Sequence, residues 1–299
     1  AVSEAAARNV DATIAIVDRV GNVLGVYQMS GSEPFVTITS TAEVGGPVVG
    51  GLENLNFIPA TLAAVSKAMT GAYLSTTGNA FTTRTASQIV QENFNPGERD
   101  VPSGPLFGVQ FSQLPCSDFS TRFTSGVGPG PRRAPLGLSA DPGGMPLYLD
   151  GVAVGGVGVI ADGVYGLDKN IGDFDQDLDE IIATAATVGY AAPIDIRADQ
   201  ITIVGKTARF SDSFVEDLVS TTSDFTSLAE LEASGTGSLV AVPGYYAGSR
   251  TLAGTIFGTS PSGIRPADAG FFADANGESL DAFVFVDGSD TNRFPATEA

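Results

Sequence analysis

The chain has 299 residues, with 34 acidic side chains, 15 basic side chains and no histidine, so its formal net charge at pH 7 is −19. This charge repels nucleic acid and anionic membranes, and the lack of histidine removes the Ser-His-Asp triad, the commonest zinc ligand and the usual haem ligand. The single cysteine, Cys116, excludes an internal disulfide and an iron–sulfur cluster held within one chain.

With 43% hydrophobic and 16% charged residues, the chain is expected to fold around a core rather than to be disordered. No window approaches the length of a membrane span, so we expect no transmembrane segment. The acidic excess favours a high-salt or extracytoplasmic setting, where net charge keeps a protein in solution. We therefore expect a secreted or periplasmic location.

The first expected elements are a short helix and a β-hairpin. Alanine-rich residues 2–8 favour the helix, and ATIAIVD (12–18) and VLGVYQM (23–29) read as two strands joined by a turn. Residues 30–56 are rich in Gly, Ser, Thr and Pro and predict a long loop.

Two helices are expected in the middle of the chain. Pro59 suits a first helical turn, and apolar residues at three-to-four spacing predict a helix to about residue 75. A second helix is predicted over 83–93, ended by the turn sequence Asn95-Pro96-Gly97. Prolines interrupt residues 98–133, which predict a second long loop that is either functional or interfacial.

A second hairpin is expected around Asp150-Gly151, a strong turn signal. The predicted strands are 136–139, 147–149 and 152–160, and a helix is predicted over 178–188. Short apolar runs separated by Gly and Ser follow, so the C-terminal hundred residues predict β structure and loops. We expect one α/β domain over 1–165 and a C-terminal extension over 166–299.

Three blocks, 12–29, 60–86 and 140–162, together resemble the GlcG/HbpS-like family of haem-binding and small-ligand-binding domains. The blocks are a hairpin of the form IVDRVGN, a helix containing KAMTGA, and a closing hairpin that runs from GGMP to GGVGV. The resemblance implies a mixed α/β domain, in which helices pack on an antiparallel sheet, and assembly into oligomers. Independently of the resemblance, each predicted hairpin requires its two strands to pair antiparallel.

The resemblance implies ligand contacts on the two middle helices, where Lys67 matches the family's motif and other polar residues lie near it in sequence. An anionic group such as a haem propionate would prefer Lys67 and Arg84, because cations are few. The alternative is that Lys67 is ion-paired with its stem on apolar surface. Gly143 and Gly144 do not follow the order of a phosphate loop, and the alternative is a tight turn with close backbone approach. The predicted ligand-binding residues are Lys67, Arg84, Gln91, Glu92, Gly143 and Gly144.

Haem is one expected ligand, although Asn93 stands where the resemblance implies a histidine. Without histidine, an axial ligand to haem iron could come only from a tyrosine, the cysteine or a methionine. These residues are Tyr27, Tyr73, Tyr148, Tyr165, Tyr190, Tyr245, Tyr246, Cys116, Met29, Met69 and Met145.

A calcium site is suggested by Asp173, Asp175, Asp177 and Asp179, which offer carboxylates at the alternate spacing of calcium loops. The loop lacks the glycine and the final glutamate of an EF-hand. The alternative is helix capping, because Asp177 and Glu180 form a D-x-x-E capping box.

The sequence therefore predicts a non-catalytic, self-associating, extracytoplasmic protein that binds a small ligand, for which haem is a candidate. The alternative is a structural or assembly subunit with a vestigial pocket, in which long Gly- and Pro-rich loops contact other subunits. An enzyme ranks third, because no acid–base constellation is evident beyond scattered carboxylates.

Overall fold

The computed structural model describes residues 1–39, 53–91, 94, 99–102, 104–106, 134–168, 170–220, 222–248, 250–278 and 282–293. These residues belong to two compact units, Ala1–Leu252 and Ala253–Ala299. The helices of the first unit are α1 (Val2–Ala7), α2 (Ala60–Tyr73), α3 (Thr83–Ile89), α5 (Leu178–Ala186) and α6 (Leu228–Ala233). Its strands are β1 (Thr13–Asp18), β2 (Val23–Met29), β3 (Phe35–Thr39), β4 (Ile58–Pro59), β5 (Gly144–Leu149), β6 (Val152–Ile160), β7 (Val164–Gly166), β8 (Thr202–Ile203), β9 (Lys206–Thr207) and β10 (Gly237–Leu239).

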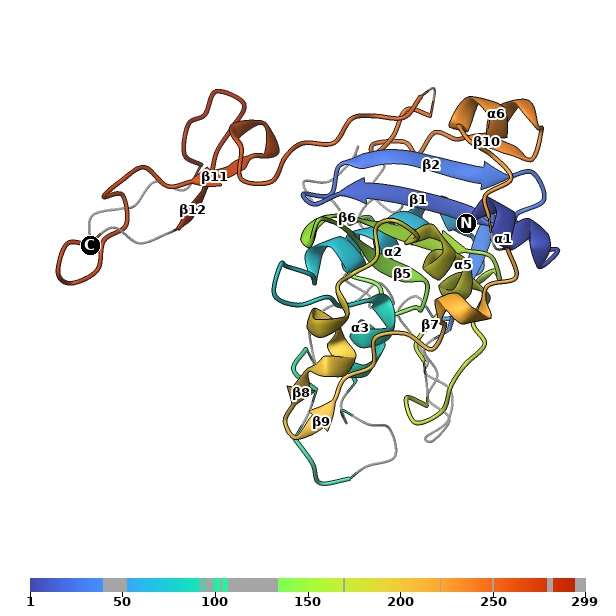
Figure 1. Cartoon of the computed structure of the whole chain (residues 1–299), viewed down its shortest axis with the longest axis horizontal. Helices are drawn as coiled ribbons and strands as arrows, with labels where there is room; N and C mark the ends of the chain where they lie inside the picture. Colours follow the sequence, from blue (N-terminus) through green and yellow to red (C-terminus); the bar gives the residue numbers. More distant parts are fainter. Residues whose placement is uncertain are drawn as a thin grey trace. The chain divides into compact units, whose positions relative to one another are not determined.

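An antiparallel sheet in the order β10-β2-β1-β6-β5 forms the centre of the first unit (Figure 1). Both predicted hairpins are present. Asp150 and Gly151 connect β5 to β6 with φ of 50° and 80°, the conformation that a type I′ turn requires. The predicted antiparallel sheet with helices packed on it is therefore confirmed.

Helix α2 lies directly on one face of this sheet because the facing residues of β6 are glycines. A Cβ atom at Gly156 would lie 2.1 Å from the carbonyl oxygen of Ala68, and one at Gly158 would lie 2.1 Å from that of Ala64. Alternate residues of β1 and β2, such as Val17 and Val26, complete a buried core against the helix. The small residues thus allow the close contact between helix and sheet.

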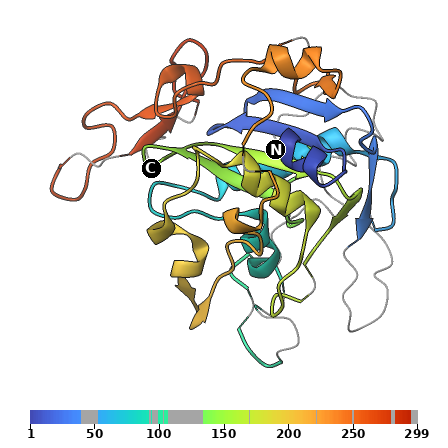
Figure 2. The ribbon, with the colours of Figure 1, turned by 45° about the vertical axis from the view of Figure 1, so that its right-hand side comes forward.

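The opposite face of the sheet packs against α1 and α5 (Figure 2). Val157 and Val159 of β6 contact a core that includes Ile181 and Ile182 of α5. Because α5 and β10 belong to this layered unit, the unit continues beyond residue 165, the boundary expected from the sequence.

Three sequence-based expectations differ from the structure. Within the predicted loop 30–56, β3 pairs with β4 and β7, because Val36 and Ile38 alternate into the core. The predicted strand 136–139 does not form, since the amides of Leu136 and Ser139 donate to hydroxyls of α2 instead of a neighbouring strand.

The predicted helix 83–93 is shorter, because α3 ends at Ile89. The carbonyl oxygen of Ile89 accepts a hydrogen bond from the amide of Leu106 at 2.9 Å. The end of α3 is therefore bonded to a segment that is distant in sequence. Most of the predicted loop 98–133, with Cys116, lies outside the described residues.

The second unit contains the two-stranded antiparallel sheet of β11 (Ile264–Pro266) and β12 (Phe283–Phe285). Short strands were expected in this part of the chain. The helix α6, which belongs to the first unit, was not expected. Across the described parts of both units, every helix falls short of the length and apolar character that a membrane crossing demands.

Candidate functional site

Lys67, the residue that matches the family motif, is completely buried on α2. Its ammonium group pairs with Asp141 and Asp179 and donates to the carbonyl oxygen of Val159 at 2.9 Å. Burial alone would lower the pKa of Lys67, but the two carboxylates outweigh it and raise the pKa. The ion-paired alternative is therefore the one seen, and the ammonium has no donor left for a ligand.

Arg84 is also completely buried, on α3, and carboxylates surround its guanidinium. Nε and Nη2 donate to the two oxygens of Glu180, each at 3.1 Å. Nη1 donates to Asp168 at 2.8 Å and Asp175 at 3.0 Å, and lies 3.2 Å from Asp212. Burial alone would lower the pKa of Arg84, but Glu180 and the other carboxylates raise it. Like Lys67, Arg84 has no free face for an anionic ligand.

These groups form what we call the charged junction, made of Lys67, Arg84, Asp141, Asp168, Asp175, Asp179, Glu180 and Asp212. Carboxylates outnumber cations in it, and burial disfavours their charged form. Burial raises the pKa of Asp141 to about 7 against the opposing charge of Lys67, and that of Glu180 to about 7 against Arg84. The junction therefore retains protons at a pH where free carboxyl groups have lost them.

The other predicted ligand contacts are also engaged within the protein. The Gln91 side-chain amide donates to the carbonyl oxygens of Ser87 at 2.7 Å and Asp168 at 3.0 Å. Gly143 has a φ of 105°, and a Cβ there would lie 2.5 Å from that of Asp179; one at Gly144 would lie 2.5 Å from the Lys67 carbonyl oxygen. Gly143 thus lies in the turn before β5, and Gly144 begins that strand in close contact with the α2 backbone, as in the alternative interpretation. Glu92 and Asn93 lie outside the described residues.

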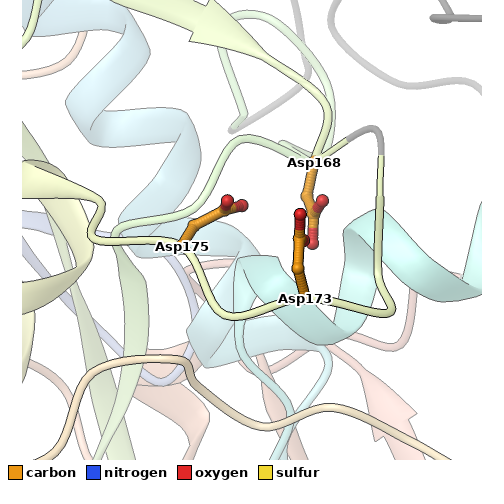
Figure 3. Close-up of side chains that lie close together, drawn as sticks. All are labelled: Asp168, Asp173 and Asp175. Carbon is orange, nitrogen blue, oxygen red and sulfur yellow. The ribbon is translucent and has the colours of Figure 1, made fainter.

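The four aspartates of the suggested calcium loop separate into different roles. Asp173 and Asp175 converge with Asp168, and oxygen atoms of the three lie within 4.8 Å of one another (Figure 3). Asp177 instead caps α5 by accepting from the Glu180 amide at 2.8 Å, and Asp179 pairs with Lys67. Capping by Asp177 is confirmed, but the capping box is not complete, because the Glu180 carboxylate accepts from Arg84 and the Asp212 amide. Calcium binding stays a prediction.

A cavity of about 780 Å³ lies elsewhere in the first unit, on the sheet face that packs against α1 and α5. Its floor includes Ile14 and Ile16 of β1, Tyr27 of β2 and Leu239 of β10. Ile14, Tyr27 and Leu239 form one row across three strands, since Tyr27 is paired with the other two. The walls come from the end of α5 and from the segment after it, and include Ala186, Val188, Leu218, Phe225, Leu228 and Leu231. We call this space the apolar cavity.

The polar groups of the apolar cavity are mostly hydroxyls, and its lining contains no lysine or arginine side chain among the described residues. The carboxylate of Glu4 accepts from the amides of Val219 at 3.0 Å and Ser220 at 2.7 Å, and from Arg8 at 2.7 Å. These bonds hold the wall segment to α1. The Tyr27 hydroxyl is buried, and it has no hydrogen-bond partner in the described part of the chain.

Sequence reasoning missed this cavity as a site and reached Tyr27 only as one of many candidate iron ligands. Its residues come from α1, two central strands, α5 and residues 218–252, so no local spacing brings them together. The signal appears only in the structure, where Ile16 of the central strand β1 is 40% exposed although it is apolar.

No family model matches the chain, and no curated protein matches it. Solved structures similar to the chain include the following two. The crystal structure of a PduOC:heme complex is 18% identical, with a TM-score of 0.34, over 63% of this chain and 84% of that chain. The crystal structure of the Klebsiella pneumoniae protein ORFY, of the family DUF336, is 18% identical, with a TM-score of 0.30, over 63% of this chain and 81% of that chain.

Proposed function

We propose that the chain is a non-catalytic protein that binds a small, mainly apolar ligand in the apolar cavity. The size and the lining of the cavity carry the proposal: about 780 Å³ lies within the range of small-molecule sites, which are typically apolar with a few polar groups. Catalysis receives no support from the lining. Its buried carboxylate, Glu4, is held by two amides and Arg8 and is not free to act as a general base.

Haem is the ligand implied by the sequence resemblance, and the lining meets its needs in part. The cavity offers apolar surface for a porphyrin ring, and among its hydroxyls is the phenol of Tyr27, which could ligate iron. It offers no lysine or arginine side chain to the two propionates, and Lys67 and Arg84 are closed within the charged junction. The lining therefore does not match the negative charge of the haem propionates. The proposal is made for small, mainly apolar ligands and not for haem.

The test is a fluorescence titration of the full chain with N-phenyl-1-naphthylamine, an uncharged apolar probe. We expect saturable binding, and a loss of affinity of about tenfold or more in Ile16→Trp, whose ring would fill the cavity floor. Leu149→Trp is the matched control, because Leu149 is also a half-exposed strand residue but does not line the cavity. Absence of probe binding, or equal affinity in Ile16→Trp, would overturn the proposal.

Haem is tested by the absorption spectrum of the full chain during titration with haem. A Soret band that survives desalting in the wild type and is lost in Tyr27→Phe would make haem the ligand of this cavity. We expect no such band, because the propionates have no cationic side chain to pair with in the described lining.

A second candidate function, an assembly subunit, is favoured by the second unit. Five phenylalanines there are between 37% and 53% exposed: Phe257, Phe271, Phe272, Phe283 and Phe285. Two-stranded sheets this short are marginally stable alone, and exposed aromatic groups are enriched at interfaces. We propose that this unit contacts a second copy of the chain, and that the acidic protein acts in an extracytoplasmic setting.

Sedimentation equilibrium tests this second function. The full chain is expected to sediment as a multimer, and Phe283→Ser with Phe285→Ser is expected to sediment as a monomer. Val204→Ser, an exposed apolar residue of the first unit, is the control. A monomeric wild type would exclude self-association without affecting the cavity.

A further inference from the structure

We propose that the apolar cavity selects uncharged amphipathic ligands of the long-chain alcohol class, and that the Tyr27 hydroxyl forms a hydrogen bond with the oxygen of the ligand. This inference rests on the proposed function, because it assigns a ligand class to the same cavity.

The first argument is the state of Tyr27. This side chain is 6% exposed and lines the cavity, and its hydroxyl finds no hydrogen-bond partner in the described part of the chain. A buried hydroxyl without a partner is unfavourable, and its neighbours on the sheet, Ile14 and Leu239, cannot supply one. A ligand oxygen next to Tyr27 would satisfy it.

Tyr27 would meet that oxygen as a neutral hydroxyl. Burial, and then the charge of Glu232 on α6, raise the pKa of Tyr27 above its ordinary value. The hydroxyl can therefore both donate and accept a hydrogen bond, which suits an alcohol oxygen.

The second argument is the charge around the cavity. Glu4 lines it and is 1% exposed, and although burial alone would raise its pKa, the amides of Val219 and Ser220 hold the pKa below its ordinary value. Glu4 is therefore ionised.

A carboxylate ligand would thus lose its hydration beside ionised Glu4, and no lysine or arginine side chain of the described lining would compensate. Arg8, the cation nearest in sequence, is bonded to Glu4 and to the carbonyl oxygen of Asp217. An alcohol of the same length meets no such penalty.

The third argument is the distribution of polar groups. The strands supply an apolar floor, whereas Ser220, Thr222, Ser223, Thr226 and Ser227 place hydroxyl-bearing residues along one wall. The hydroxyls of Ser220, Ser223 and Thr226 donate within this segment, so the wall can offer hydroxyl oxygens as acceptors to a second polar group of a ligand without adding charge. Together, floor and wall fit an amphipathic molecule rather than a pure hydrocarbon.

The experiment is displacement of N-phenyl-1-naphthylamine from the full chain by 1-decanol and by decanoate at neutral pH. These competitors have the same chain length and differ in the charge of the head group. We expect 1-decanol to displace the probe at a concentration about tenfold lower than decanoate. Equal potency of the two competitors, with the probe bound, would overturn the charge selection and leave the proposed function standing.

Tyr27→Phe tests the hydrogen bond. We expect the affinity for 1-decanol, relative to that for the probe, to fall about three- to tenfold, the usual effect of one lost hydrogen bond. Tyr190→Phe, an exposed tyrosine outside the cavity, should leave this ratio unchanged. An unchanged ratio in Tyr27→Phe overturns the role of Tyr27, whereas failure of the probe to bind the wild type overturns the proposed function itself.

Melting curves without ligand show whether the variant is folded. Because the Tyr27 hydroxyl has no partner in the described structure, Tyr27→Phe should melt at the same temperature as the wild type or higher. The stabilisation by 1-decanol should be smaller in this variant than in the wild type.

Discussion

The two ends of α5 occupy very different surroundings. At its N-terminus, Asp179 and Glu180 pair with Lys67 and Arg84 inside the charged junction, where each cation is surrounded by carboxylates. Beyond its C-terminus, Val188 borders the apolar cavity, where Tyr27 has no hydrogen-bond partner within the described residues. In the first region the buried charged groups all have partners in the protein, whereas the second region has a buried hydroxyl without one among the described residues. Buried charges near one end of α5 are structural, and the proposed binding site lies near the other end.

The largest effect is expected from breaking the charged junction. Arg84→Ala removes the guanidinium that bonds Glu180 and Asp168 and leaves buried carboxylates without their cation. We expect the free energy of unfolding to fall by about 3–5 kcal/mol, measured by urea denaturation. Arg250→Ala, at an exposed arginine, is the control. A loss below about 1 kcal/mol would mean that the junction is not a structural centre.

The next effect tests the close contact of α2 with β6. Gly158→Ala places a Cβ atom 2.1 Å from the carbonyl oxygen of Ala64, so helix and strand must separate. We expect a loss of about 1–3 kcal/mol in urea unfolding. Gly78→Ala is the control, because its Cβ would meet only Thr76 Oγ1, at 3.9 Å. Equal stability of the two variants would contradict the tight packing of this face.

A smaller effect is expected from pH. The pKa of Asp141 is raised to about 7 in the folded chain, from an ordinary value of 3.8. Between these values the folded chain holds a proton that the unfolded chain has released, so the stability contribution is present at low pH and lost as pH rises towards 7.

Asp141→Asn should therefore show a weaker decline of the melting temperature over this range than the wild type. We expect the falls in melting temperature over this range to differ by at least a few degrees, since even 1 kcal/mol shifts the melting temperature by about 2–4 °C in a domain of this size. Asp150→Asn, at an exposed turn position, should keep the wild-type slope. Parallel curves for the wild type and Asp141→Asn would show that Asp141 does not carry the proton.

The same contrast explains what could be predicted from the sequence. The hairpins and α2 follow from local patterns: alternation, the Asp150-Gly151 turn and helical spacing all act within a few residues. The strand predicted at 136–139 failed because the hydroxyls of Ser66 and Thr70, distant in sequence, bind the amides of that segment. Local propensity contains no information about such partners.

The site was harder to predict for a related reason. Lys67 and Arg84 stand out in the sequence because cations are rare in this chain. Their rarity does not reveal their carboxylate partners, which are distant in sequence: Asp212 lies 128 residues after Arg84. The apolar cavity has no motif, since Tyr27 and Leu239 become neighbours only when β10 joins the sheet. Its position depends on tertiary pairing.

The smallest effect is expected from calcium. Asp168 and Asp175 both accept hydrogen bonds from Arg84, so a cation bound with Asp173 would have to displace or repel the guanidinium. We therefore expect the melting temperature with calcium chloride to lie within about 1 °C of that with a chelator. Asp173→Asn, which removes an exposed carboxylate from the cluster, should behave in the same way. A rise of several degrees in the wild type that is lost in Asp173→Asn would instead establish a calcium site at the edge of the charged junction and show that the junction is not complete without a ligand.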